Sequence, residues 1–439
     1  MRSKVTLLIL AAAALGLASS AAMAVPYASG ITDLGGGNYS FILNQDAVWV
    51  RIDRQGDTSL PLGALPRGTH TFNLGSGTGF DIRVFNSEPL GWNQYIPDDT
   101  LTSFYSPCGV SINKNPASAN FGKVYISETR TATTGFGRSV TSGIYMLNAD
   151  ASDAGWANGG VDWTVQGNLA PFKSTIGPDN NLYVADYSND LAFGFNADLS
   201  VATQLIDASN KTDGQYVEGI YVEGSQAGGD RSVYLVDSHY LDARRGLIRY
   251  DLGGDATATP GDLGTQWIGP DYFGFYPRDV ARDSDGDWYM NQYRYSPNQA
   301  PALTKFDGTG TIPLGDDPSE VLWETDISVF TGAYALDINE DAGVIAYGHY
   351  YTGEVFIFDL ETGILIESFD AGNRIRELAF DAAGNLVTGD NSVEWARFWS
   401  PGGDWLAITG SDGTFTLIPE PACLTLLALG GLALLRRRR

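Results

Sequence analysis

The 439-residue sequence is poor in cysteine, histidine and basic residues. Its two cysteines, Cys108 and Cys423, exclude a disulfide framework. The 27 Lys and Arg residues stand against 52 Asp and Glu residues, which gives a formal net charge of −25. A nucleic-acid-binding protein needs a basic face, so this charge argues against a nucleic-acid partner. The sequence also lacks a nucleophile elbow, a phosphate loop and zinc-ligand spacing, the motifs that would by themselves suggest an enzyme.

Glycine and aromatic residues, in contrast, are abundant. The chain contains 53 Gly, 22 Tyr, 20 Phe and 10 Trp, and 43% of its residues are hydrophobic. That apolar content is sufficient for a packed core. Many glycines, many aromatics and few long helical patterns are typical of short strands joined by tight turns. We therefore predict an all-β fold.

The first 24 residues have the pattern of a signal peptide. Arg2 and Lys4 precede an apolar run over residues 5–17, and the small-x-small site of residues 22–24 follows. We expect signal peptidase to cleave after Ala24 and the protein to be exported. The alternative is an uncleaved anchor helix, for which the apolar run is short.

The other end of the sequence has three consecutive parts. Pro419, Glu420 and Pro421 are followed by an apolar stretch over residues 422–435 and by four arginines at 436–439. This order resembles the PEP-CTERM sorting signal of Gram-negative, exopolysaccharide-producing bacteria. The apolar stretch predicts a short C-terminal membrane helix, and the arginines would keep its end cytoplasmic. A plain C-terminal membrane anchor is the alternative interpretation.

The resemblance implies partners and a location. An exosortase-type enzyme would recognise residues 419–421 and remove the segment 419–439 after its transient insertion in the inner membrane. The protein would then reach the periplasm, the outer envelope or the extracellular matrix of a Gram-negative bacterium. Exopolysaccharide is the macromolecular partner that this context suggests.

Residues 107–417 form a loose repeat. Each unit has an apolar strand, a turn rich in Asp, Asn and Gly, and a strand rich in Tyr and Val, as in 174–186, 279–290 and 377–388. Two further strands complete the unit. Six such units predict a six-bladed β-propeller, because radial stacking buries faces that a single unit leaves exposed. A seventh blade is the alternative. The units resemble NHL or gluconolactonase-type propellers.

The segment 25–96 has a different pattern. Short runs of alternating apolar and polar residues, such as 48–52, 69–74 and 80–85, are separated by glycine-rich turns. These runs predict a small immunoglobulin-like β-sandwich ahead of the propeller.

Candidate binding residues follow from propeller geometry. The start of the first strand and the end of the second strand of each unit lie at one sheet edge, so ring closure gathers six such edges around one mouth. We predict a ligand-binding face there, rich in carboxylates and aromatic rings. It comprises Asp186, Tyr187, Asp237, His239, Tyr240, Tyr293, His349, Tyr350, Asp390 and Trp395.

Three functions compete for this mouth. The gluconolactonase resemblance implies a central divalent cation such as Ca²⁺ on Glu218, Asp279 and Glu377, and hence a metal-dependent, lactonase-like hydrolase. The second function is carbohydrate binding, with rings stacked on sugar faces. The third is a structural matrix or adhesion protein whose acids and tyrosines only stabilise the fold. We favour an exported envelope or matrix protein that binds a ligand such as carbohydrate over an enzyme.

Overall fold

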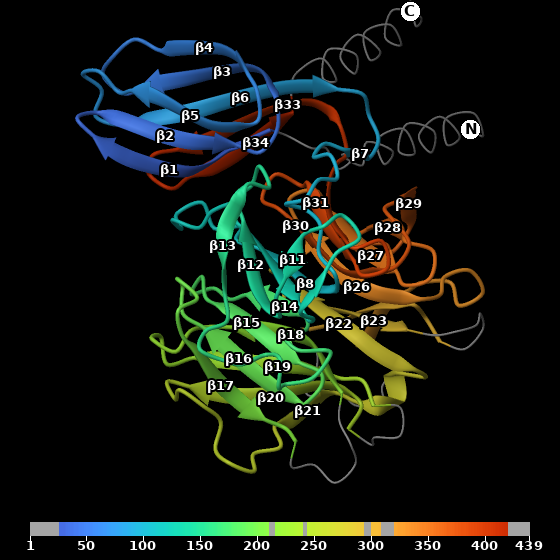
Figure 1. Ribbon diagram of the computed structural model, residues 1–439. Helices are drawn as coiled ribbons and strands as arrows, with labels where there is room; N and C mark the ends of the chain where they lie inside the picture. The colour runs from blue at the N-terminus through green and yellow to red at the C-terminus, as the bar shows by residue number, and fades with distance from the viewer. Residues whose placement is uncertain (1–25, 210–215, 240–243, 294–299, 309–319, 420–439) are drawn as a thin grey trace, which may run out of the picture.

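The computed structural model describes residues 26–209, 216–239, 244–293, 300–308 and 320–419 (Figure 1). Within these ranges the chain is almost entirely strands and turns, and the one helix is the 3-10 turn η1 (Pro270–Tyr272). The prediction of an all-β fold is confirmed. None of the helical structure in these ranges is long and apolar enough to cross a membrane. The predicted signal peptide, with Ala24, and residues 420–439 lie outside the described residues.

A β-sandwich of two antiparallel sheets occupies one end of the molecule (Figure 1). Its core forms because alternate residues point to the same side of a strand, as in β6, where Phe80, Ile82 and Val84 are buried. The smaller sheet contains β1 (Ala28–Gly35), β2 (Asn38–Leu43) and β5 (Gly68–Asn73). The larger sheet has the order β34 (Phe415–Pro419), β33 (Gly403–Gly410), β6 (Phe80–Glu88), β3 (Ala47–Arg54) and β4 (Leu60–Leu65).

The sandwich takes two strands from the far end of the sequence. β33 pairs with β6 along its whole length, from Gly403 opposite Glu88 to Gly410 opposite Asp81. The residues from 403 to 417, which we expected in the propeller, therefore belong to a sandwich sheet. The alternation in β33 shows that it is a strand but not which sheet it joins, and the open edge of β6 provides the partner.

Within the described ranges, six four-stranded antiparallel sheets follow, called sheets 1 to 6 and given from the innermost strand outward. Sheets 1 to 3 contain β8 (Pro107–Ile112), β9 (Val124–Glu128), β12 (Gly143–Leu147) and β13 (Asp153–Ala157); β14 (Ser174–Ile176), β15 (Leu182–Asp186), β16 (Leu191–Phe195) and β17 (Ala202–Asp207); and β18 (Val217–Glu223), β19 (Arg231–Asp237), β20 (Gly246–Gly253) and β21 (Thr265–Ile268).

The other three sheets have the same plan. Sheets 4 to 6 contain β22 (Tyr276–Arg282), β23 (Trp288–Tyr293), β24 (Leu303–Phe306) and β25 (Val321–Glu324); β26 (Ala333–Asn339), β27 (Val344–His349), β28 (Glu354–Asp359) and β29 (Leu365–Asp370); and β30 (Ile375–Phe380), β31 (Leu386–Asp390), β32 (Trp395–Ser400) and β7 (Asn93–Gln94). A small hairpin of β10 (Ala132–Thr133) and β11 (Ser139–Val140) stands apart from the sheets.

The innermost strands contact one another in a closed cycle. β8, β14, β18, β22, β26 and β30 each touch the next strand, and β30 touches β8. Hydrophobic clusters fill the spaces between neighbouring sheets, as where Val110 and Ile126 of sheet 1 pack with Ala379 and Val387 of sheet 6. Radial packing of four-stranded sheets around one axis is the β-propeller architecture, so that prediction is confirmed.

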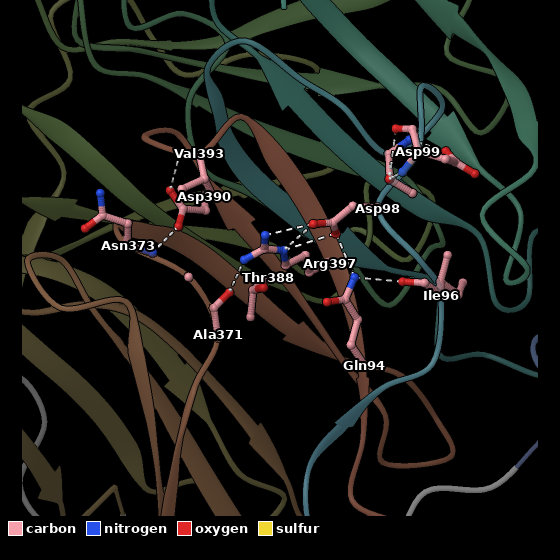
Figure 2. Close-up of polar contacts among 12 residues, drawn as sticks. Gln94, Ile96, Asp98, Asp99, Ala371, Asn373, Thr388, Asp390, Val393 and Arg397 are labelled. Carbon is pink, nitrogen blue, oxygen red and sulfur yellow. Dashed lines mark hydrogen bonds and ion pairs between the residues drawn. The ribbon is translucent and has the colours of Figure 1, made fainter. Parts of the chain in front are cut away.

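The N-terminal part of the chain closes this ring. β7 pairs with β32, with Gln94 opposite Trp399. Beyond β7, the Arg397 guanidinium donates two hydrogen bonds to the Asp98 carboxylate, from Nη2 to Oδ2 over 2.8 Å and from Nε to Oδ1 over 3.1 Å (Figure 2). Gln94 Nε2 also donates to Asp98 Oδ1 over 2.7 Å. We call residues 93–99 the closing segment. It lies in the propeller, although we expected the sandwich to extend to residue 96.

The propeller has two faces. The start face is where the innermost strands begin, and the hairpin face is where each innermost strand turns into the second strand. The sandwich packs on the hairpin face. Tyr27 and Trp405 of the sandwich share a buried cluster with Phe121 of the β8–β9 connection and Ala383 of the β30–β31 connection.

Candidate functional site

The start face is shaped by β-bulges. In five sheets the register of the innermost strand shifts near its first residues. A bulge turns an additional side chain away from the regular ladder. Because these strands surround one axis, the bulged side chains gather at the centre of the face. The residues at the bulges are Cys108, Glu218 with Gly219, Arg278, Tyr334 and Arg376.

The centre of the start face is a cluster of arginines and tyrosines. Arg376 donates from Nη1 to the Tyr334 hydroxyl over 2.6 Å and from Nη2 to the Tyr350 hydroxyl over 3.1 Å. The Tyr334 and Tyr350 rings stack with centroids 4.9 Å apart. The guanidinium carbon of Arg278 lies 5.0 Å from the Tyr293 and Tyr334 ring centroids. We call these five residues the central cluster, and its cation–π contacts hold the two guanidinium groups in place.

A ladder of aromatic rings extends from the centre toward sheet 3. Tyr187 stacks on Tyr216 at 5.0 Å, and Tyr216 stacks on His239 at 5.2 Å. Tyr216 is 36% exposed, and Tyr351, whose hydroxyl contacts that of Tyr293, is 46% exposed. The structure thus brings the predicted residues Tyr187, His239, Tyr293 and Tyr350 to one face, together with aromatic residues that the sequence analysis missed. Those are Tyr216, Tyr276 and Tyr334, and Tyr351 lies on the same face.

Trp395 lies at the rim of this face and is buried. Only 4% of it is exposed, and its ring lies 4.0 Å from that of Phe136. Tyr240, which we also predicted to contact ligand, lies outside the described residues.

The residues at the ends of the second strands cap turns. Asp186 Oδ1 accepts the amides of Ser188 and Asn189 over 2.9 and 3.1 Å. Asp390 Oδ1 accepts those of Ser392 and Val393 over 2.8 and 3.1 Å (Figure 2).

The same arrangement recurs in two other sheets. Asp237 Oδ1 accepts the amide of His239, and His349 Nδ1 accepts the amides of Tyr351 and Thr352. Each of the four, Asp186, Asp237, His349 and Asp390, which we predicted to bind ligand, caps a turn in the structure. A buried acceptor at this position satisfies backbone donors that the ladder leaves free.

Burial shifts the pKa values of two of these turn-capping residues, Asp186 and His349. It raises the pKa of Asp186 to about 6, against the opposing effect of hydrogen bonds from Asn189 and Ser188. It lowers the pKa of His349, and the neutral ring is the form that can accept at Nδ1. Both effects follow from the cost of charge in a site away from water.

The three predicted metal ligands are paired with basic side chains. The Lys173 ammonium lies 2.7 Å from Asp279 Oδ2 and 3.0 Å from Glu377 Oε2, and it also donates to the carbonyl of Tyr334 over 2.8 Å. Glu218 forms an ion pair with Arg278. Burial, with Asp279 as neighbour, raises the pKa of Glu377.

These pairings correct the predicted metal centre. In the part of the chain that the structure describes, no group of three or more His, Cys, Asp or Glu side chains is placed to hold a metal ion. Lys173 occupies the position between Asp279 and Glu377 that a bound cation would take. The sequence did contain a signal against a metal site. Lys173 stands at the start of a first strand, and its positive charge competes with a metal ion for the same carboxylates.

A cavity of about 780 Å³ lies along the axis on the hairpin side. Asn113, Lys114 and Asn180 line it, and Phe415 of the sandwich also borders it. It reaches inward to Asp279 and Glu377. This cavity therefore faces away from the predicted mouth.

Comparisons with known proteins concern the fold alone. No protein-family model and no curated protein matches the chain. A protein of unknown function from Bacteroides thetaiotaomicron has 11% identity and a TM-score of 0.44, over 86% of this chain and 98% of that chain. The WD40 β-propeller domain of Doa1 has 10% identity and a TM-score of 0.38, over 86% and 94%. Virginiamycin B lyase from Staphylococcus aureus has 13% identity and a TM-score of 0.36, over 76% and 88%.

Proposed function

We propose that this chain is an exported protein of the Gram-negative envelope or extracellular matrix, and that the start face of its six-bladed propeller binds carbohydrate. The observation that carries the binding proposal is the aromatic surface there. Tyr216 stacks between Tyr187 and His239 and still exposes 36% of its surface. Tyrosine combines a flat apolar face with a hydroxyl. It loses little conformational entropy on binding, because its side chain has few rotatable bonds. These properties suit the alternating C–H and O–H groups of a sugar ring.

The export part of the proposal is supported by the two ends of the sequence. Residues 1–24 have the signal-peptide pattern, and residues 419–439 have the order of a PEP-CTERM signal. Pro419, the first residue of that motif, is also the last residue of β34. An exosortase-type enzyme could therefore remove the tail without taking a strand from the sandwich. Mass spectrometry of the native envelope-associated protein tests this part, since an intact 436–439 segment would contradict it.

A glycan array followed by calorimetry tests the binding part. Tyr216→Ala and Tyr351→Ala should each weaken binding about 5-fold, which corresponds to a stacking contribution of about 1 kcal/mol. Trp156→Ala is the matched control, because Trp156 is 41% exposed but lies on the outermost strand of sheet 1. Equal binding by the wild type and both tyrosine variants, or binding of no glycan, would refute the proposal.

A structural matrix protein is the second candidate. It is favoured by the turn-capping roles of Asp186, Asp237 and Asp390, which use predicted ligand groups within the fold. The lactonase alternative depended on metal ligands that pair with Lys173 and Arg278 instead.

A further inference from the structure

Arg376 is half-buried, and the hydrogen bonds of its side chain go to neutral groups. Its two terminal nitrogens donate to the hydroxyls of Tyr334 and Tyr350. Its Nε is buried and has no hydrogen-bond partner among the residues that the structure describes. Among the residues that the structure describes, none forms an ion pair with it. A buried charge without a counter-charge is costly, so this arrangement calls for an explanation.

A second arginine lies beside it. Arg374 stacks on the Tyr350 ring, with its guanidinium carbon 4.9 Å from the centroid, and remains partly exposed. Its backbone amide donates to Asp390, but its side chain has no ion-pair partner within the described ranges. Arg278, the third arginine of this region, is the one that pairs with a carboxylate, Glu218.

The centre of the start face is rich in arginine, although the whole chain is acidic. Acidic residues outnumber basic ones by 52 to 27 overall. At the centre of the start face, Arg278, Arg374 and Arg376 meet around the same tyrosines, with Glu218 as the paired carboxylate. In a protein this acidic, two arginines without acidic partners mark a place where an anion can bind from outside.

The geometry favours a planar anion on a ring. A guanidinium group binds a carboxylate through two parallel hydrogen bonds, and this fit distinguishes arginine from lysine. The exposed ring of Tyr351 lies 5.2 Å from that of Tyr350, on which both arginines stack. A pyranose that carries a carboxylate satisfies both features.

We infer that the start face recognises acidic sugars, with Arg374 and Arg376 contacting the carboxylate of a uronic acid unit. This inference rests on the proposed carbohydrate-binding function and names its ligand class.

Calorimetry with matched sugars tests the inference. The ligands are trigalacturonate and trimannuronate, each compared with the same trisaccharide after reduction of its carboxyl groups to alcohols. We expect the acidic form to bind at least 10-fold more tightly than its reduced form. Arg374→Gln and Arg376→Lys should each remove most of that difference. Arg249→Gln is the control, because Arg249 stacks on Trp267 at 4.5 Å within sheet 3 and should leave the difference unchanged.

The outcomes separate the inference from the function beneath it. Equal binding of acidic and reduced sugars, with no effect of the arginine variants, would overturn the inference and leave carbohydrate binding intact. Binding of neither form would overturn both. Circular dichroism checks folding of the variants, and Arg374→Gln supplies the test if Arg376→Lys fails to fold, because Arg374 is partly exposed and its backbone contact to Asp390 is retained.

Discussion

Replacing Lys173 by methionine should destabilise the propeller strongly. Lys173 is 1% exposed, and the side chains of Asp279 and Glu377 that it pairs with are 8% and 4% exposed. Removing one member of a buried ion pair costs about 3–5 kcal/mol, because the remaining charge has neither water nor a partner. At about 2.1 cal/mol/K of unfolding entropy per residue, 4 kcal/mol in this 439-residue chain lowers the Tm by about 4–5 °C.

The effect should depend on pH with a definite sign. Burial and Asp279 already raise the pKa of Glu377, and loss of the ammonium raises it further. The folded variant then binds protons more readily than its unfolded chain, so its stability recovers as the pH falls. The difference in Tm between the wild type and Lys173→Met should therefore be larger at pH 8 than at pH 5.

Calorimetric melts at the two pH values measure both effects. Lys114→Met is the matched control, because Lys114 pairs with Asp337 at 2.9 Å but is 41% exposed, and such pairs contribute about 0–1 kcal/mol. The triple variant Lys173→Met, Asp279→Asn, Glu377→Gln should recover part of the loss by removing the unpaired charge. A loss for Lys173→Met no larger than for Lys114→Met, or a loss independent of pH, would refute the reasoning.

Two further predictions concern ring closure and pH. Arg397→Ala should lower the free energy of unfolding by about 2 kcal/mol, because it releases Asp98 of the closing segment. Arg51→Ala removes a more exposed pair with Asp53 and should lower it by less than about 0.5 kcal/mol. Thermal melts compare the two variants, and equal losses would contradict the closing role. Burial raises the pKa of Glu128 to about 7, so the folded protein binds a proton at this residue more readily than the unfolded chain does. Stability is therefore lost as the pH rises from about 4.5 to 7. Glu128→Gln should flatten the dependence of Tm on pH in that window, and an unchanged slope would contradict the prediction.

The strand repeat could be predicted because its causes are local. Residues 279–290 alternate around an Asp-rich turn, and the structure has β22 and β23 there. Asp283 accepts the Asp287 amide over 2.7 Å and the Tyr289 hydroxyl over 2.8 Å, which explains why this turn needs an acid. Period-two alternation and turn residues are properties of short segments, and a single sequence displays them.

The strands that join the two domains could not be predicted in the same way. β7 has two residues and no alternation to detect. β33 has a clear strand pattern, but its partner β6 lies more than 300 residues earlier, and one sequence carries no record of that pairing.

Two of the three predicted metal ligands lie one position away from the side chains at the centre of the face. We chose Asp279 and Glu377 at the starts of the first strands, whereas the bulges turn Arg278 and Arg376, one residue earlier, toward the centre of the face. A bulge depends on packing around the ring and leaves no mark in the strand pattern. Residue type showed that acids lie near the axis, but not that lysine and arginine would neutralise them.

The exchange of strands between the two domains sets an order of events during synthesis. β6 keeps an unpaired edge until β33 emerges, and the contact of Phe80 with Ser411 joins residues 331 positions apart. Sheet 6 of the propeller is likewise incomplete until β30, β31 and β32 have been synthesised, because β7, near the start of the chain, pairs with β32. A polypeptide that stops early is thus unfinished in both domains at once, with open strand edges that proteases and holding chaperones recognise. Neither domain can pair all of its strands, and so resist proteases, until synthesis of the chain is complete.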